Sequence, residues 1–242
     1  MVLSLDREPW RSLEKAQRET WAGTLPPSVE LVHLQGVAGG APRMIFLAAR
    51  KIAERMRLRK SFDSLAGRIS IRMPVRINQG VIRADIPEFW IGTSAKMHSG
   101  LRFVAKHLKF DYLVRTNSST YLHVPRLVEF LHAAPRENFY SGADQGEPHA
   151  QGTCIILSRD AVEKLALDEC WEYFKVDDQA IGGAAQRAEI PYNPVPQVIV
   201  ESVEAGLRFD YLPAPFIYRL KTRKNRLEDA KAMELLHGRL AT

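Results

Sequence analysis

The sequence predicts an α/β protein with a mostly parallel central sheet flanked by helices. Short apolar segments alternate along the chain with longer segments whose apolar residues recur at helical spacing. The composition is ordinary for a globular protein, since 45% of the residues are hydrophobic and 26% are charged. A chain of 242 residues can bury one sizeable core, so we expect a single domain spanning residues 1–242.

The first half of the chain begins with the pattern of a βαβ unit. Strands are expected where apolar runs are short and helices where the period is 3.6. The expected elements are, in order, a strand at 2–5, a helix at 6–21 capped by Asp6, a strand at 29–34, a turn at Gly36, Gly39 and Gly40, a basic helix at 48–62, a β-prone segment at 69–75 and a helix at 94–108.

The second half continues the alternation of strands and helices. The expected elements are a buried strand at 110–114, a helix from Pro125 to about 133, a strand at 153–157, a helix capped by Ser158, a helix at 177–188, a basic segment at 218–226 and a closing helix at 227–236. Gly182 and Gly183 lie inside one of these helices, so we expect that helix to pack closely against a strand there. Ligands of open α/β sheets bind beyond the carboxyl ends of strands, which places the expected site at residues 115–120.

The charge balance favours an anionic partner. The formal net charge is +6 and the pI is near 9.4, values compatible with a nucleotide diphosphate, a phospholipid surface or a nucleic acid. Basic residues are scattered and no aromatic-interleaved motif occurs, so we expect no nucleic-acid partner. Cys154 and Cys170 are far apart and adjoin apolar residues, which favours two buried thiols in a reducing compartment.

Membrane association is expected to be peripheral at most. No segment approaches the ~20 apolar residues of a membrane span, and the first ten residues lack the basic region of a secretory leader. We therefore expect a cytoplasmic protein. The basic run at residues 50–60 is compatible with an amphipathic helix at the inner face of an anionic membrane, and equally with a solvated helix face.

Four blocks resemble, in order, those of the fringe and β-1,3-galactosyltransferase family of inverting glycosyltransferases. They are EKAQRETW around Arg18, the segment FDYLVRTNSSTYLHVPRL, the segment YSGADQGEPHAQGTCIILSRDAVEKL with Gly152 ahead of a strand, and VDDQAIGGAAQRAEI with Asp177 and Asp178 on the family's acidic pair. The resemblance covers about residues 1–220. It implies a single domain of the GT-A type, which binds nucleotide sugars, in which the basic tail and helix at 218–242 close over the donor site.

The second block departs from the family pattern at its metal-binding aspartates. Asn117, Ser118 and Ser119 stand where the family has three aspartates, and Arg115 replaces its lysine. In the family those carboxylates hold Mn²⁺, a hard cation that needs anionic oxygen ligands. Amide and hydroxyl oxygens make a poor site for it, so we expect no divalent metal and no other cofactor.

The resemblance also implies roles for individual residues. Asp178 is the expected catalytic base, and Asp177 either raises the pKa of Asp178 or orients the acceptor together with Gly152. The alternative is that both aspartates only favour the positive end of a helix. The donor is expected to contact the residues Arg18, Arg115, Thr116, Asn117, Ser118, Ser119, Arg219, Lys221, Arg223 and Lys224.

Each donor contact has a structural alternative. Arg219 stands near the position of the family's metal-binding histidine, and with its basic neighbours it could form a clamp over the diphosphate, as in metal-free core-2-type N-acetylglucosaminyltransferases. The same stretch could be a solvated loop. Arg115 could pair with an internal acid such as Asp111, and Asn117 could serve ordinary turn chemistry.

The predicted activity is metal-independent, inverting hexosyl transfer in bacterial surface polysaccharide synthesis. The implied donor is a nucleotide sugar, by family default a UDP-sugar, and the acceptor is a hydroxyl of a glycan or lipid-linked glycan. The alternative function is a non-catalytic protein that binds glycans or nucleotide sugars through a decayed transferase site, because loss of the aspartates is what such decay would produce.

Overall fold

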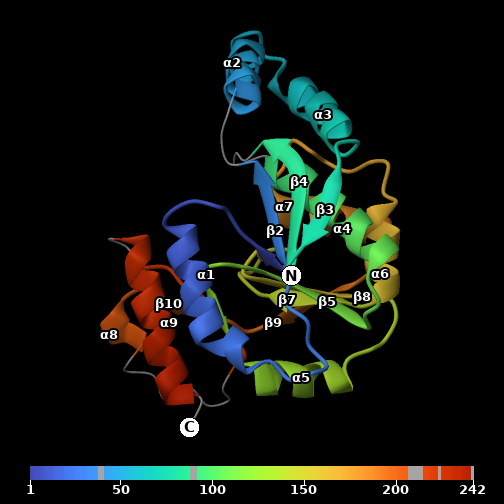
Figure 1. The fold of residues 1–242 in the computed structure, drawn as a ribbon. Coiled ribbons are helices and arrows are strands. Elements are labelled where there is room, and N and C mark those ends of the chain that lie inside the picture. Colours follow the sequence, from blue (N-terminus) through green and yellow to red (C-terminus); the bar gives the residue numbers. More distant parts are fainter. Residues whose placement is uncertain (38–40, 88–91, 207–214, 223–224, 241–242) are drawn as a thin grey trace.

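The fold is organised around an eight-stranded sheet with the strand order β3-β4-β2-β1-β5-β8-β7-β9 (Figure 1). The structure is a computed structural model that describes residues 1–37, 41–87, 92–206, 215–222 and 225–240. The strands of this sheet are β1 (Val2–Leu3), β2 (His33–Val37), β3 (Val75–Asn78), β4 (Val81–Pro87), β5 (Tyr112–Asn117), β7 (Tyr140–Ala143), β8 (Cys154–Ser158) and β9 (Tyr192–Val195).

The sheet is mixed, so the expectation of a mostly parallel sheet is not confirmed. Strands β4, β2, β1 and β5 run parallel to one another. Strand β8 is antiparallel to both β5 and β7, and β3 is antiparallel to β4. The predicted α/β class holds, because the parallel part is the βαβ region that the alternating pattern indicated.

A smaller sheet and the helices complete the structure. The smaller sheet has the order β10-β11-β6, with β10 (Val198–Val200), β11 (Ile217–Leu220) and β6 (Thr120–Leu122). The helices are α1 (Trp10–Glu19), the 3-10 helix η1 (Trp21–Thr24), α2 (Ala41–Arg55), α3 (Arg59–Ser70), α4 (Gly92–His107), α5 (Val124–Ala133), α6 (Arg159–Ala166), α7 (Asp177–Arg187), α8 (Val203–Gly206) and α9 (Arg226–Leu240).

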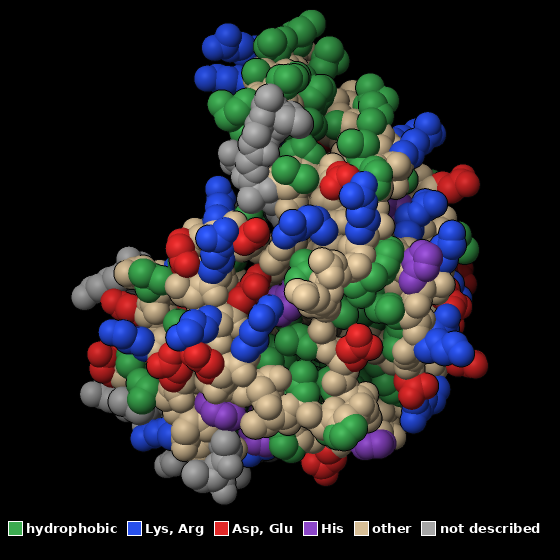
Figure 2. Space-filling model, in the orientation of Figure 1, with side chains coloured by type: hydrophobic (Ala, Val, Ile, Leu, Met, Phe, Trp, Pro, Cys, Tyr) green, Lys and Arg blue, Asp and Glu red, His purple; other side chains and the backbone are tan. Residues whose placement is uncertain are grey.

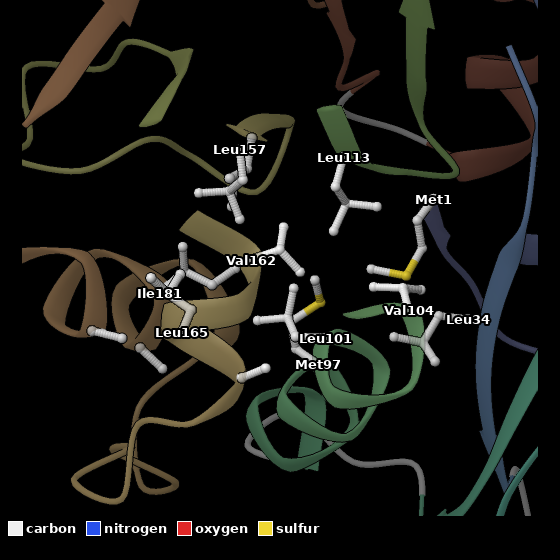
Figure 3. Close-up of a cluster of buried hydrophobic side chains, with 14 of the residues drawn as sticks. Met1, Leu34, Met97, Leu101, Val104, Leu113, Leu157, Val162, Leu165 and Ile181 are labelled. Atoms are coloured by element: carbon white, nitrogen blue, oxygen red, sulfur yellow. The ribbon is translucent and has the colours of Figure 1, made fainter. Parts of the chain in front are cut away.

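The eight-stranded sheet separates two apolar cores. Alternate residues of β8 face opposite ways, so Ile155 and Leu157 belong to one core while Cys154 and Ile156 belong to the other. The first core lies under α4, α6 and α7, and Figure 3 shows part of it. The second is enclosed by α1, α5, α9 and the smaller sheet. Burial on both faces explains why the central strands read as continuous apolar runs.

Several expected elements are corrected in the first half of the chain. The helix expected at 48–62 is two helices, α2 and α3, because the backbone reverses at Arg57, whose φ is 59°. The segment expected to be β-prone from residue 69 is still helical to Ser70, and β3 begins only at Val75. Strand β2 begins at His33, not at residue 29. Asp6 does not cap α1; its carboxylate pairs with Arg11 at 2.9 Å.

Corrections in the second half concern short strands and single side chains. Strand β11 includes the first three residues of the basic segment expected at 218–226, for which no strand was expected, and β7 was not expected either. Ser158 occupies the N-cap position of α6, but its hydroxyl donates to Asp160 Oδ1 and makes no capping bond. Cys154 is buried as expected, whereas Cys170 is exposed.

Helix α7 is closely packed at its two glycines, but the closest neighbours are His149 and Glu172, which lie outside strands, and not residues of a strand as expected. A Cβ added at Gly182 would lie 2.5 Å from His149 Cβ, and one added at Gly183 would lie 2.5 Å from Glu172 Oε2. Both contacts are closer than packed atoms tolerate, so α7 can approach these neighbours only without side chains at the two positions. In the described ranges no helix has the length and apolar character needed to cross a bilayer.

Candidate functional site

The strand order places a topological switch point between β1 and β5. From β1 the chain continues to β2 and β4 on one side, and β5 then pairs with β1 on the other side. Since these strands are parallel, their carboxyl ends lie at one edge of the sheet. Ligands of open α/β sheets bind outside such a point. The edge here is formed by Ser4 after β1 and by Asn117 at the end of β5.

The turn from Asn117 to Thr120 is held by the Asn117 side chain. Its Oδ1 accepts hydrogen bonds from the Ser119 backbone N–H and hydroxyl, both at 3.1 Å, and from the Thr120 hydroxyl at 2.9 Å. Its Nδ2 donates to the Gly152 carbonyl at 3.1 Å. The side chain predicted to contact the donor therefore also sets the shape of the turn.

The other predicted polar residues of this segment are buried. Thr116, Ser118 and Ser119 each expose less than a tenth of their surface. The Thr116 hydroxyl donates to the Thr153 carbonyl at 2.7 Å, which ties β5 to the segment before β8. The contacts within the chain do not test whether these three side chains also bind a donor. Donor contact through them stays a prediction.

Helix α1 and η1 support the turn from below. Gln17 Nε2 donates to the carbonyls of Asn117 at 3.1 Å and Thr120 at 3.3 Å, and Trp21 Nε1 donates to the Thr120 carbonyl at 3.1 Å. The first sequence block is thus joined to the second over a separation of about a hundred residues. Arg18 of the same block is exposed on α1 and was the residue predicted to bind the donor.

Arg115 and Asp177 form a buried ion pair at the base of the site. The Arg115 guanidinium donates to the Asp177 carboxylate and to the Gly152 carbonyl. The internal acid that pairs with Arg115 is thus Asp177; Asp111 instead pairs with Arg136 at 2.6 Å. Burial raises the pKa of Asp177, while the Arg115 guanidinium acts to lower it.

Lys96 of α4 is a cation that the sequence pattern did not single out. Its side chain is almost fully buried and its Nζ donates to the Ser4 carbonyl at 3.2 Å. The positive charge of Lys96 also acts to lower the pKa of Asp177. Periodicity gave no signal for Lys96, because residues 94–101 of α4 are buried on every side of the helix.

Asp178 differs from its neighbour in being only half-buried. Its Oδ2 accepts the Gly152 backbone N–H at 3.0 Å, and its Oδ1 accepts the Gln179 backbone N–H at 2.8 Å. A Cβ added at Gly152 would lie 2.7 Å from an Arg115 guanidinium nitrogen and 3.3 Å from Asp178 Oδ2. Glycine at this position therefore lets Arg115, Asn117 and Asp178 converge on the backbone of one residue.

Arg219 reaches the same place from the smaller sheet. It lies on β11, is half-buried, and its guanidinium donates to Gln151 Oε1 at 2.6 Å. Burial lowers the pKa of Arg219, as does the nearby Arg226, whereas the charge of Asp178 raises it. Lys221 is exposed. The predicted Arg223 and Lys224 lie outside the described residues.

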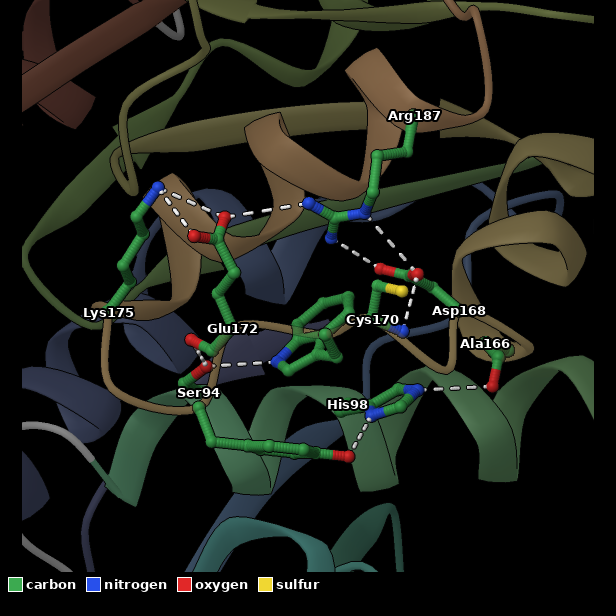
Figure 4. Close-up of polar contacts among 10 residues, drawn as sticks. Ser94, His98, Ala166, Asp168, Cys170, Glu172, Lys175 and Arg187 are labelled. Carbon is green, nitrogen blue, oxygen red and sulfur yellow. Dashed lines mark hydrogen bonds and ion pairs between the residues drawn. The ribbon is translucent and has the colours of Figure 1, made fainter. Parts of the chain in front are cut away.

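A polar cluster fixes the segment that leads into α7 (Figure 4). Arg187 pairs with Asp168 at 2.6 Å, and Trp171 Nε1 donates to the Ser94 hydroxyl at 2.9 Å. His98 is stacked on Trp171, with ring centroids 4.4 Å apart. These contacts hold the chain between α6 and α7 against α4, and so determine where Asp177 and Asp178 begin α7.

The backbone of Gly152 is therefore the centre of the candidate site. Around it lie a half-buried carboxylate, a half-buried guanidinium and a hydrogen-bonded polar turn, contributed by Asp178, Arg219 and the segment 117–120. In the described ranges no three His, Cys, Asp or Glu side chains are grouped so that they could hold a metal ion. The arrangement provides one proton acceptor and one cation for an anionic ligand.

A cavity of about 500 Å³, lined by apolar residues and by some charged ones, has neither Gly152 nor Asp178 in its lining. It is at the opposite, amino-terminal edge of β2 and β5, and its lining includes Trp21, Leu31, Tyr112 and Leu131. The convergence of polar and charged groups on Gly152 is the better guide to chemistry, because reactions need titratable groups in mutual reach.

No known protein family and no curated protein matches the sequence of this chain.

Proposed function

We propose that this protein is an inverting, metal-independent glycosyltransferase of the GT-A type that transfers a sugar from a nucleotide-sugar donor to a glycan hydroxyl. One observation carries the proposal. Asp178, Arg219 and the Asn117 turn come from distant parts of the chain and meet around Gln151 and Gly152. Their meeting place adjoins the switch point of the sheet, where α/β proteins bind nucleotides.

Asp178 is the proposed general base. In the transfer, its carboxylate takes the proton of the acceptor hydroxyl while the acceptor oxygen bonds to the anomeric carbon. The bond from that carbon to the diphosphate oxygen breaks, and the nucleoside diphosphate leaves with the electron pair. Attack opposite the leaving group inverts the anomeric centre. Asp178 suits this role better than Asp177, which is buried in the pair with Arg115.

Arg219 is the proposed electrostatic partner of the leaving group. The diphosphate gains negative charge as the glycosidic bond breaks, and a guanidinium can donate two parallel hydrogen bonds to phosphate oxygens. Arg219 is half-buried, so its charge is less screened than that of the exposed Lys221. Arg223 and Lys224 are proposed to assist it from the tail.

Arg115, Lys96 and Asp177 are proposed positioning residues. The two cations are buried beneath the site and interact electrostatically with Asp177, the first residue of α7. They fix the start of α7, and hence Asp178 beside it. A buried carboxylate without such partners would be costly, so the arrangement depends on all three groups together.

Donor class, acceptor and location are part of the same proposal. A UDP-sugar is the proposed donor, and a glycan or lipid-linked glycan at the cytoplasmic face of a bacterial membrane is the proposed acceptor, in surface polysaccharide synthesis. Nucleic acid is not a proposed partner, and no divalent metal or other cofactor is assigned to the reaction.

Calorimetric titration tests donor binding. UDP and UDP-sugars are titrated into the full chain with Mn²⁺ and separately with EDTA, and we expect the same affinity in both. Binding only with Mn²⁺ would show that the metal-independent mechanism is wrong. Binding of no nucleotide would contradict the proposal that the protein is a transferase.

Sugar transfer to a mixed glycan acceptor pool tests the roles of the residues. Asp178→Asn should bind UDP normally and lose transfer by at least about a hundredfold, whereas the surface control Asp111→Asn should keep both. Arg219→Ala should lower transfer more than Lys221→Ala does. An equal loss in Asp177→Asn with intact folding would assign the base to Asp177 instead.

A non-catalytic binding protein is the second candidate function. Both oxygens of Asp178 already accept backbone N–H groups, so fewer of their lone pairs are free to take a proton from an acceptor hydroxyl. Such a protein would bind a nucleotide sugar or glycan at the same site with no turnover of UDP-sugars. Release of UDP from bound donor therefore separates the two candidates.

A further inference from the structure

Helices α2 and α3 form a hairpin with large apolar side chains on its outer surface. Eight of the thirteen large apolar side chains that are exposed in the described part of the chain lie between residues 44 and 73. They are Met44, Ile45, Ile52, Met56, Leu58, Leu65, Ile69 and Met73. Figure 2 shows hydrophobic side chains gathered over this end of the molecule, where Figure 1 places the hairpin. Exposed apolar surface of this kind marks an interaction site.

The exposed apolar residues of α2 form a stripe. Residues 44, 48, 52 and 56 are four apart and therefore lie one above another on one side of the helix. Met44, Ile52 and Met56 are each more than half exposed, and Ile45 beside them is 69% exposed. Ala53, on the other side of α2, is buried. Helix α2 thus turns four large apolar side chains outward, those of Met44, Ile45, Ile52 and Met56.

The same segment contains the net charge of the whole chain. Residues 44–73 include eight Lys and Arg but only two Asp and Glu, whereas the chain has 34 and 28, a formal net charge of +6. The rest of the sequence is therefore balanced. Lys51 and Arg55 are exposed beside the apolar stripe. A partner of this surface must accept apolar side chains and a concentrated positive charge together.

The hairpin is fixed from its inner side. Arg50 of α2 donates to both oxygens of the buried Asp63 of α3, at 2.8 and 3.1 Å. The rings of Phe46 and Phe62 lie 5.2 Å apart. Gly67 is packed so closely against Tyr173 that an added Cβ would overlap the ring. The outer stripe is therefore presented by a preformed element that need not fold on binding.

We propose that the α2–α3 hairpin binds the surface of an anionic lipid bilayer. Amphipathic helices with apolar side chains on one side and Lys or Arg beside them lie in the headgroup region, where the apolar side chains reach the acyl chains and the cations meet lipid phosphates. A second copy of the chain fits less well, because a symmetric contact would bring two such positive segments together.

The hairpin and the candidate site lie at the same edge of the sheet. Helix α2 follows the carboxyl end of β2, and after α3 the chain returns at Val75, which pairs with Ala84 in the middle of β4. A membrane bound by the hairpin would therefore lie on the side of the molecule where Asn117 ends β5. Membrane binding does not depend on the proposed transferase activity.

Vesicle co-sedimentation of the full chain tests this proposal. We expect binding to vesicles of phosphatidylglycerol and phosphatidylcholine, little binding to phosphatidylcholine alone, and release as sodium chloride is raised. Ile52→Ser with Met56→Ser should lower the bound fraction about tenfold. Lys51→Gln with Arg55→Gln should lower it and weaken its dependence on salt.

Matched variants away from the hairpin are the controls. Leu167→Ser removes an apolar side chain that is 77% exposed, and Lys15→Gln with Lys231→Gln removes two exposed charges; both should bind vesicles like the unmodified chain. Absence of binding to anionic vesicles, or equal binding by the hairpin variants, would overturn the proposal. A dimer in light scattering that Ile52→Ser with Met56→Ser converts to monomer, without vesicle binding, would assign the surface to a second copy.

Discussion

Helices α2 and α4 are of similar length, but α4 buries charged and polar side chains whereas α2 exposes large apolar ones. Helix α4 buries Lys96 and His98 among apolar side chains. Helix α2 exposes Ile45, Ile52 and other large apolar side chains while it forms the wall of a basic hairpin. Buried polar groups and exposed apolar groups are the informative exceptions to the rule that apolar residues lie inside. In this molecule they mark two different surfaces, one beside the candidate site and one facing outward.

The difference between the two helices shows that a buried charge and an exposed apolar surface need different kinds of partner. The charge of Lys96 is balanced within the chain, by the Ser4 carbonyl and by interaction with Asp177. The exposed stripe of α2 has its proposed partner outside the chain. Substitutions should therefore be costly to folding around α4 and the Arg115–Asp177 pair, and nearly neutral to folding on the outer surface of the hairpin.

The largest expected effect is at Arg115. Arg115→Met removes the cation that balances the buried Asp177, and we expect the free energy of unfolding to fall by about 3–5 kcal/mol, because an unpaired charge is left inside. Urea denaturation measures this. Adding Asp177→Asn should restore part of the loss; if the double variant is less stable than Arg115→Met, the ion pair is not the source of the effect.

An intermediate effect is expected from His98 as pH changes. Burial lowers the pKa of His98 to about 4, although the hydrogen bond to the Ala166 carbonyl opposes the shift. In the unfolded chain His98 takes up a proton near pH 6.5, whereas in the folded chain it stays neutral at that pH. Stability is therefore full above that pH, and up to about 3 kcal/mol is lost as the pH falls from about 6.5 to about 4.

His98→Gln isolates this contribution. Glutamine can still bond to Tyr173 and Ala166 but does not titrate, so its stability should fall less between pH 7 and pH 4.5 in urea denaturation. His33, whose pKa is also lowered by burial, and Asp177 titrate equally in both proteins and cancel in the comparison. If the free energy of unfolding falls equally with pH in both proteins, His98 binds protons equally well in the folded and unfolded chains, and the prediction is wrong.

The smallest effect is expected on the outer surface of the hairpin. Ile52→Ala should change the free energy of unfolding by less than about 0.5 kcal/mol, because Ile52 is 58% exposed. Leu101→Ala on α4 is the matched control, since Leu101 is fully buried in the first core and its truncation should cost about 2–5 kcal/mol. Similar losses in both variants would mean that Ile52 is packed in solution.

The longer elements were predictable because their periodicity is strong. Segments 94–108, 153–157 and 177–188 are close to α4, β8 and α7. The reversal at Arg57 was not, because no glycine or proline marks it and its conformation depends on contacts between α2 and α3 such as Arg50 with Asp63. Strand β7, with the sequence YSGA, has too little apolar pattern to reveal that it is buried.

The sequence predicted several residues of the candidate site but few of the contacts between them. The order of the sequence blocks led to Asn117, Gly152 and Asp178, which the structure brings together. The pairing of Arg115 with Asp177 spans 62 positions and no local pattern encodes it. Lys96 was missed because it lies away from the side of the helix on which Leu101, Val104 and Leu108 recur, so the apolar period did not predict its burial.

The two groups assigned to the proposed chemistry belong to different sheets. Asp178 is tied through Gly152 to the large sheet, whereas Arg219 lies on β11 of the small sheet, and the chain passes from β5 to β6 through the short Asn117 turn. The distance between the Asp178 carboxylate and the Arg219 guanidinium therefore depends on how the two sheets are placed relative to each other. In the proposed reaction, the packing of the two sheets against each other would set the distance between the base and the cation that meets the leaving group.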